Sequence, residues 1–143
     1  MTVGGPARRR LLRALLVLLG VLAVTGAAWA GTYLNSAVLL LSQSSKEGDY
    51  LRAHIGDKEL SELIHKLASA RLEAAKGMLV PKEVVQAHPH LLLVLENYER
   101  AADAATRGES EKFLVYQQRA RDEERTFRGV LRQFGYTLPE AKP

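Results

Sequence analysis

The chain has 143 residues and no cysteine, which excludes disulfide bonds, thiolate catalysis and thiolate zinc sites. Its formal net charge of +4 belongs to the N-terminus, because four of the 20 basic residues lie at positions 8–13 and the other 16 equal the 16 acidic residues in number. The remaining chain is neutral overall, so no nucleic-acid-binding face is expected.

Residues 1–10 are expected to form a cytoplasmic basic arm, and residues 11–34 a transmembrane helix. No charged residue or histidine occurs within 14–45. A helix over 11–34 would be about 36 Å long, enough to cross a hydrocarbon core of about 30 Å. Trp29 and Tyr33 are predicted to lie in the outer head-group region as aromatic anchors. The positive-inside rule keeps the N-terminus in the cytoplasm through Arg8, Arg9, Arg10 and Arg13.

The same segment also has features of a cleavable signal peptide. Leu11–Val24 would be its apolar region, and the small residues around Trp29 would allow cleavage after Ala30. The arginine cluster resembles a twin-arginine signal, although no Ser or Thr precedes it. Apolar residues resume at 37–41, which favours an uncleaved signal-anchor. In both cases the rest of the chain lies outside the cytoplasm, and the uncleaved form is a single-pass protein of the inner membrane of a bacterial envelope.

Residues 35–56 are expected to form a juxtamembrane helix and a linker. Helical periodicity extends to about residue 46, and Gly48 is a candidate break within a polar stretch. The sequence leaves open whether this segment joins the domain that follows.

Residues 57–136 contain amphipathic segments and no alternating strand pattern, which predicts an extracytoplasmic helical bundle. The first segment is expected to follow an N-cap at Gly56 and to end at Gly77 in a left-handed conformation. Its predicted buried stripe includes Leu63 and Leu67.

The second segment is expected to begin with His88 as its cap and Pro89 at the first helical position. Gly108 would end it, and Ser110 would cap the third segment. The three segments are joined by short connections, which favours antiparallel neighbours.

Gly135 is expected to end the last helix, with Tyr136 folding back on Leu131 in a Schellman arrangement. Residues 137–143 would be a flexible tail. The predicted fold class is therefore all-α: an N-terminal transmembrane signal-anchor helix followed by a small antiparallel bundle. The bundle would have three helices, or four if residues 33–47 pack against it.

His88 and His90 flank a proline and form the one local group of metal-ligand type in the sequence. Their spacing does not place them one above the other on a helix, as His-x-x-x-His does. We therefore interpret them as a capping and a surface histidine, and no metal ligand is predicted.

Two features are candidate interaction surfaces. Residues 91–95 are apolar all round a helix, which indicates either a central helix or an exposed patch that includes Leu92 and Leu93. The last helix carries an arginine stripe that could meet an anionic partner, or could be a solvated flank neutralised by neighbouring acids. The stripe consists of Arg121, Arg125, Arg128 and Arg132.

The sequence contains no nucleophile elbow, zinc-protease helix or defined acid–base pair, so no catalytic residue and no cofactor is predicted. We expect a non-enzymatic protein that lies in the lipid bilayer and binds an envelope protein or itself, as a scaffold, accessory or sensor subunit. Two alternatives stay open. One is a periplasmic ligand or metal carrier released by cleavage after Ala30, and the other is an enzyme whose active site a single sequence does not reveal.

Overall fold

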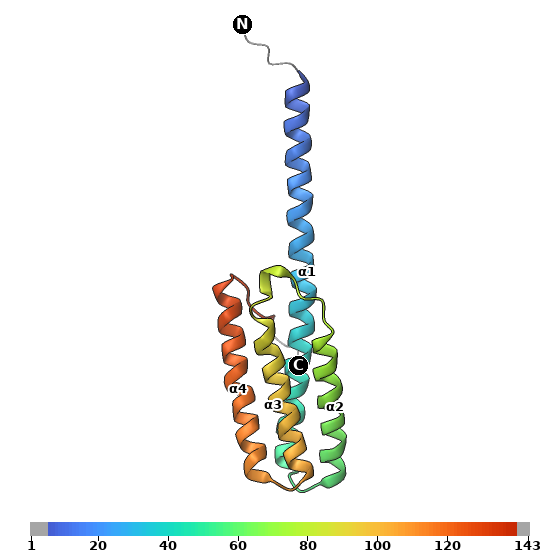
Figure 1. The fold of residues 1–143 in the computed structure, drawn as a ribbon, viewed down its shortest axis with the longest axis vertical. Helices are drawn as coiled ribbons and strands as arrows, with labels where there is room; N and C mark the ends of the chain where they lie inside the picture. Colours follow the sequence, from blue (N-terminus) through green and yellow to red (C-terminus); the bar gives the residue numbers. More distant parts are fainter. Residues whose placement is uncertain (1–5, 140–143) are drawn as a thin grey trace.

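The computed structural model describes the backbone of residues 6–139 and the side chains of residues 29–139 (Figure 1). This part of the chain is all-helical and contains no strand, which confirms the predicted class. The α-helices lie side by side in a bundle, and a short 3₁₀ turn, η1, lies between the second and the third. The elements are α1 (Pro6–Ala53), α2 (Lys58–Lys76), η1 (Lys82–Val84), α3 (His88–Thr106) and α4 (Ser110–Gln133).

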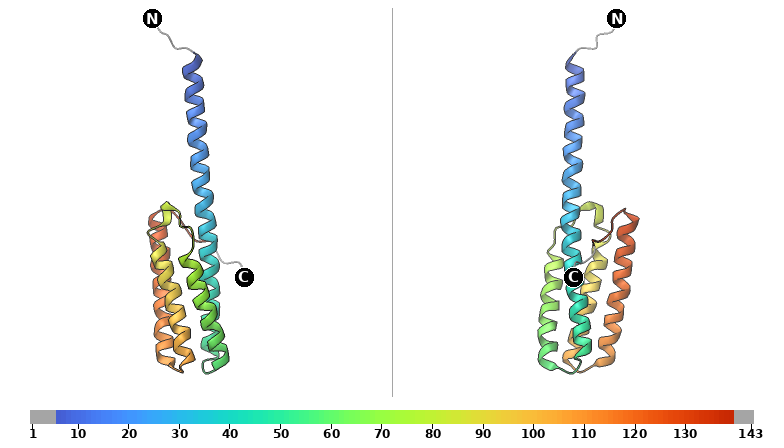
Figure 2. Two further views of the ribbon diagram at one scale, coloured as in Figure 1. Left: turned by 45° about the vertical axis from the view of Figure 1, so that its right-hand side comes forward. Right: turned by 180° about the vertical axis from the view of Figure 1, so that it is seen from behind.

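α1 is one continuous helix that belongs to two parts of the molecule. Its N-terminal half projects alone beyond the other helices, and its C-terminal half lies within the bundle (Figures 1 and 2). Buried side chains on α1 extend from Ala30 to Leu51. The bundle therefore has four helices, and the expected break at Gly48 is wrong because α1 continues to Ala53.

Gly48 serves close helix packing instead. A Cβ atom at this position would lie 3.0 Å from Cε1 of Tyr98 and 3.3 Å from Nε2 of Gln117. These distances are shorter than ordinary van der Waals contact, so a side chain at this position would press on Tyr98 and Gln117, and glycine lets α1 lie close to α3 and α4. A glycine inside a helix can thus indicate a close approach and no break.

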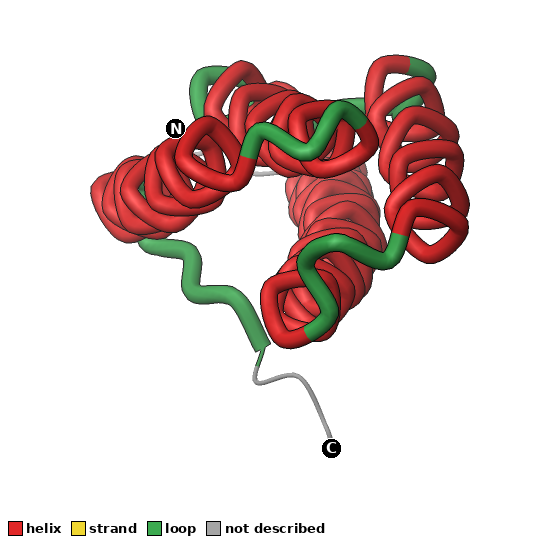
Figure 3. The backbone as a smooth tube through the Cα atoms, turned by 90° about the horizontal axis from the view of Figure 1, so that it is seen from below, coloured by secondary structure: helices red, strands yellow, loops and turns green. Residues whose placement is uncertain are grey.

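α3 is the central helix of the bundle. It packs against all three other helices, most extensively against α4 and α2, and α1 packs chiefly against it. Viewed along the bundle, the helices follow one another around its outline in the order α1, α2, α3, α4 (Figure 3). Leu91, Val94 and Leu95 are completely or almost completely buried. The interpretation of residues 91–95 as part of a central helix is confirmed.

The buried core divides into two clusters along the bundle axis. The first lies toward the end from which α1 projects and includes Leu41, Leu91 and Phe127. The second lies toward the opposite end and includes Leu51 and Phe113 together with small residues of α3. Small side chains allow neighbouring helices to approach closely in this second cluster. The alanines of α3 that take part are Ala101, Ala102, Ala104 and Ala105.

The start of α2 differs by one residue from the prediction. The N-cap is Asp57 and not Gly56, because a carboxylate can accept a hydrogen bond and glycine has no side chain to do so. Oδ1 of Asp57 accepts from the backbone N–H of Leu60 at 3.0 Å. Gly56 adopts φ 109° and turns the chain from α1 into this cap.

The predicted caps of α3 and α4 are also wrong. His88 is the first residue of α3, and its ring turns toward α1 instead of capping the helix. Ser110 is likewise the first residue of α4, and Glu109 stands at the cap position, where its side chain accepts no hydrogen bond from a backbone N–H of the first turn. The carboxylate of Glu109 instead forms ion pairs with Arg107 and Lys112.

Of the three glycines expected at helix ends, two adopt the left-handed conformation and one does not. Gly135 has φ 81°, and the N–H of Tyr136 donates to the carbonyl of Leu131 at 2.9 Å, which confirms the Schellman arrangement. Gly108 has φ 70° and ends α3 in the same way. Gly77 has φ −86°, so the left-handed conformation predicted there is wrong.

Candidate functional site

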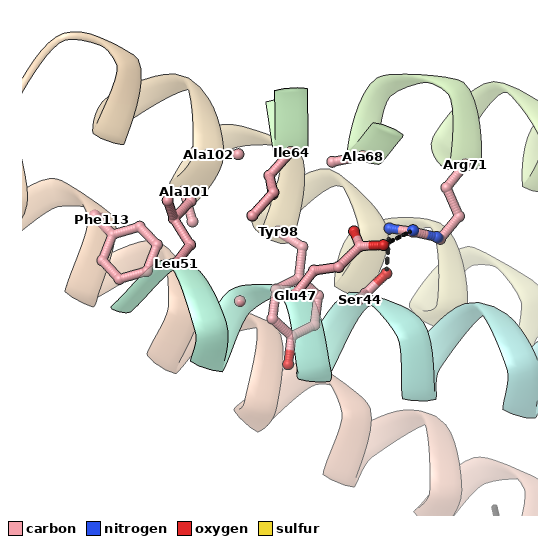
Figure 4. A pocket seen from close by; sticks show the side chains of 11 residues that line it. Ser44, Glu47, Leu51, Ile64, Ala68, Arg71, Tyr98, Ala101, Ala102 and Phe113 are labelled. Carbon is pink, nitrogen blue, oxygen red and sulfur yellow. Dashed lines mark hydrogen bonds and ion pairs between the residues drawn. The ribbon is translucent and has the colours of Figure 1, made fainter. Parts of the chain in front are cut away.

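A polar cluster lies inside the bundle, at the level between the two core clusters. Nη2 of Arg71 on α2 lies 2.7 Å from Oε1 of Glu47 on α1, and Nη1 donates to Oγ of Ser44 at 3.3 Å (Figure 4). Ser44 and Glu47 lie three residues apart on α1, so both side chains reach the face that meets α2. The cluster thus joins the projecting helix to the rest of the bundle.

Burial makes this ion pair energetically demanding. The Arg71 side chain is 8% exposed and that of Glu47 is 27% exposed. Oε2 of Glu47 is buried and accepts no hydrogen bond from any described residue. A buried charge that loses its partner is strongly destabilising. The pair therefore favours the arrangement in which α1 and α2 have this register.

The space beside the cluster is small. It measures about 10 Å³ and is lined by Leu51, Ile64 and Phe113 as well as by the polar side chains (Figure 4). This is roughly the volume that one water molecule needs. The interior cluster therefore joins helices and does not offer room for a substrate or cofactor.

Each histidine of the His88–His90 pair has a partner on a different helix. Nδ1 of His88 lies 3.0 Å from the hydroxyl of Tyr33 on α1, and Nδ1 of His90 bonds Oε1 of Glu123 on α4. Burial lowers the pKa of His88, which favours its neutral ring as the acceptor for the Tyr33 hydroxyl. No group of three His, Asp or Glu that could hold a metal ion occurs among the described residues.

A third histidine, His65, forms a similar contact between helices. Nε2 of His65 on α2 lies 2.7 Å from Oε1 of Glu99 on α3, and Oγ of Ser69 approaches the same oxygen at 3.4 Å. One imidazole–carboxylate pair therefore links α3 to α2, and the pair of His90 and Glu123 links α3 to α4. These groups were not predicted as partners because they are far apart in the sequence.

The arginine stripe on α4 is largely neutralised. Arg128 lies 2.7 Å from Glu124, and Arg125 pairs with Asp122, as the sequence predicted for a solvated flank. Arg121 pairs at 2.6 Å with an acid of α1 that the sequence did not indicate, Asp49. Among the described residues Arg132 forms no ion pair, so it is the member of the stripe that keeps an uncompensated charge.

The apolar run on α3 offers little surface. Leu92 is half-buried against the first core cluster, and Leu93 is 42% exposed. A single leucine of this exposure is common on protein surfaces. The run therefore acts mainly in the core.

α2 carries a more extended apolar surface, on residues that the sequence predicts to be buried. Leu63 is 55% exposed and Leu67 is 43% exposed, so their predicted burial is wrong. α2 instead turns small residues inward, including Ser61 and Ala68, and this brings the helix close to its neighbours. We call the exposed strip with heptad spacing the α2 face; it consists of Leu63, Leu67, Ala70 and Ala74.

A groove of about 240 Å³ lies between α1 and α4. Its floor contains Val38 and Leu41, which are only 8% and 2% exposed. Its edges carry Lys46 and the paired Arg128 and Glu124, so the groove combines apolar surface with charges of both signs. The groove has no continuous apolar strip like the α2 face.

The predicted anchor residues divide between the two parts of α1. The structure does not describe the side chains of Arg8, Arg9, Arg10 and Arg13, nor those of residues 11–28 of the predicted span. Trp29 is 60% exposed, whereas Tyr33 is 3% exposed and packs in the first core cluster. Within the described residues, no helix has an apolar stretch long enough to cross a bilayer.

Comparison with protein-family models, with curated proteins and with solved structures finds no match to this chain. The functional argument therefore depends on the geometry of the helices and on the surfaces described above.

Proposed function

We propose that the protein is a single-pass membrane protein whose extracytoplasmic bundle binds another envelope protein or a second copy of itself. The observation that carries this proposal is the continuity of α1 from Pro6 to Ala53. A helix from Leu11 to Trp29 would be about 28 Å long, close to a hydrocarbon core of about 30 Å. The next residue, Ala30, is already buried in the bundle. Membrane segment and bundle would thus be one rigid unit.

The proposed span is shorter than the sequence suggested. Tyr33 and Leu34 lie in the core of the bundle, so they are not available to face lipid. Trp29 is the last exposed aromatic residue before the core begins, and its indole suits the outer head-group region. We therefore place the end of the membrane segment at Trp29.

The α2 face supports a function by contact. Its leucines and alanines recur at alternating intervals of four and three residues, which is the spacing of a helix seam that packs against another helix. Charged residues flank it, including Glu62 and Lys66. An apolar strip with a charged flank is typical of a helix–helix contact surface. We therefore expect the partner to present a helix to α2.

Topology is the first test. The C-terminal bundle of the full-length protein should be digested by protease added to intact spheroplasts. An intact mass that includes the N-terminal residues before Gly31 would support the anchored form. A mature protein that begins at Gly31 would instead favour the released carrier, and a bundle protected until lysis would contradict the proposed orientation.

Contact is tested with a photo-crosslinking amino acid at Leu67 in native membranes. The matched control is the same substitution at Leu114 on α4, which is 42% exposed against 43% for Leu67. Crosslinks to one defined protein, or to a second copy, should form at Leu67 and not at Leu114. Equal patterns at both positions would contradict the α2 face as the contact surface.

A further inference from the structure

The end of the bundle from which α1 projects has an unusual surface. The connection between α2 and α3, residues 77–87, and the C-terminus of α4 both lie at this end (Figures 1 and 2). Leu79 is 78% exposed, Val85 is 52% exposed, and Phe134 at the C-cap of α4 is 42% exposed. Leu79 is the most exposed of the large apolar side chains that the structure describes.

These side chains are additional to those that close the core. Val84 and Ala87 in the same connection are completely buried, and Met78 and Val80 pack against the first core cluster. The connection thus has apolar residues on both sides, one toward the core and one toward the outside. Exposed apolar side chains such as Leu79 and Val85 do not stabilise a connection that faces only water.

Trp29 lies at the same level of the molecule. Tyr33, one helical turn further along α1, bonds His88 at the start of α3. Trp29 therefore lies one turn beyond the start of α3, toward the projecting part of α1, and its side chain is 60% exposed. An exposed indole beside exposed aliphatic side chains is the composition found at membrane–water interfaces.

The charges at this end favour an anionic surface. Lys76 and Glu73 at the end of α2 pair with each other, whereas Lys82, Glu83 and Arg132 form no ion pair with a described residue, which leaves one positive charge in excess among these five. Uncompensated Lys and Arg side chains near a bilayer are attracted to acidic head groups. The end thus combines apolar side chains with an excess of positive charge.

We propose that this end of the bundle rests on the outer leaflet, with Leu79, Val85 and Phe134 in the head-group region of the bilayer. The inference depends on the proposed anchoring. If Leu11–Trp29 crosses the membrane, no residue remains as a spacer before the buried Ala30, so the bundle must abut the lipid surface. Contact with lipid would fix the tilt of the bundle, which the anchor alone does not.

The absence of cysteine makes the test direct. A single Leu79→Cys substitution in the full-length protein is labelled with an environment-sensitive fluorophore, and the protein is placed in vesicles of phosphatidylcholine and phosphatidylglycerol. Quenching by lipids that carry a nitroxide on the head group is then measured. The matched control is Leu114→Cys, on α4 near the opposite end, and Leu18→Cys reports on the anchor itself.

The label at position 79 should be quenched severalfold more than the label at position 114, and the label at position 18 should be quenched by doxyl groups deep in the acyl chains. If position 79 behaves like position 114 while position 18 is quenched, the bundle stands off the lipid and this inference is overturned, although the anchoring holds. If position 18 is not quenched, the anchoring fails as well. A blue-shifted but unquenched label at position 79 would show a protein contact there and would also overturn the inference.

A second variant tests the charges. Adding Lys82→Glu and Arg132→Glu to the labelled Leu79→Cys protein should clearly reduce quenching in vesicles with phosphatidylglycerol, and should matter less in pure phosphatidylcholine. Equal quenching in all four combinations would overturn the role given to the two cations.

Discussion

The helices are connected by different kinds of loop at the two ends of the bundle. At the far end α1 passes into α2, and α3 into α4, through short loops with left-handed glycines and polar side chains that bond locally. At the end from which α1 projects, a longer connection contains a 3₁₀ turn and exposes Leu79 and Val85. In the far loops the large apolar side chain that is exposed is Ile55, at 38%, which is well below the 78% of Leu79. The near end leaves apolar surface that water does not favour.

The two core clusters follow the same division. Near the projecting part of α1, large side chains such as Phe127 and Leu131 fill the space between helices. At the far end, the alanines of α3 bring the helices together around Phe113. The buried pair of Arg71 and Glu47 lies between the clusters. Each half of the bundle can therefore be weakened separately.

The largest effect is expected from removing a core aromatic ring. Phe127→Ala should lower the free energy of unfolding by about 4 kcal/mol, because Phe127 is completely buried in the near cluster. Phe113→Ala is the matched change in the far cluster. Thermal unfolding of the detergent-solubilised full-length protein, followed by circular dichroism, gives both values. If either variant lost less than about 1 kcal/mol, that cluster would not be a core in the sense described here.

Breaking the ion pair between the clusters should have the next largest effect. Arg71→Met should destabilise the fold by about 3 kcal/mol, because Glu47 is left with a buried and unpaired charge. The double variant Arg71→Met with Glu47→Leu removes both charges and should recover most of the loss. A double variant as unstable as the single one would show that packing, and not charge, is the cause.

Two glycines of α1 provide a matched pair. Gly48→Ala should cost about 1 kcal/mol, because its methyl group would press on the buried ring of Tyr98. Gly31→Ala meets no atom within 4 Å and should stabilise the helix by about 0.5 kcal/mol. The same unfolding measurement decides the sign for each. If both substitutions raised the free energy of unfolding, α1 and α3 could move apart at Gly48 without a loss of stability.

The cap at the far end has a smaller effect. Asp57→Ala should cost about 1 kcal/mol, because the N–H of Leu60 loses its acceptor. Asp57→Asn keeps an acceptor oxygen and should stay close to the native stability. Hydrogen exchange of the first turn of α2 measures the change locally, and equal exchange in both variants would contradict the capping role.

The smallest effect concerns pH at the near end. Burial lowers the pKa of His88, whereas an unfolded chain has the ordinary value of about 6.5. The unfolded state therefore binds the proton more readily, and stability present above about pH 6.5 falls as the pH decreases toward the folded pKa. Unfolding midpoints at about pH 7.5 and about pH 5.5 should differ less in His88→Asn than in the native protein. An unchanged pH dependence in His88→Asn would assign it to other groups.

Much of the fold could be predicted from the sequence, because local signals mark it. Proline and glycine residues at the helix ends identify the bounds of α3 and α4 to within a residue or two. The Schellman arrangement at Gly135 follows from the residues beside it. The caps were less secure. Choosing Asp57 over Gly56 depends on which side chain reaches an N–H, and neighbouring residues offer similar candidates.

The contacts between helices could not be predicted, because nothing local encodes them. Arg121 and Asp49 are 72 residues apart, and either could have faced solvent. The orientation of α2 was wrong for a related reason: hydrophobicity alone centres its stripe on leucines, whereas close packing favours small residues such as Ser61 on the inner side. Gly48 was misread because helix propensity does not report what lies opposite a glycine.

The uninterrupted course of α1 has a mechanical consequence. A helix without a hinge transmits rotation about its axis and translation along it from one end to the other. Turning the projecting segment would swing Glu47 away from Arg71 and drive the Gly48 backbone against the Tyr98 ring. The bundle therefore favours one rotational position of α1. In this position Glu47 pairs with Arg71, and the backbone of Gly48 leaves room for the ring of Tyr98.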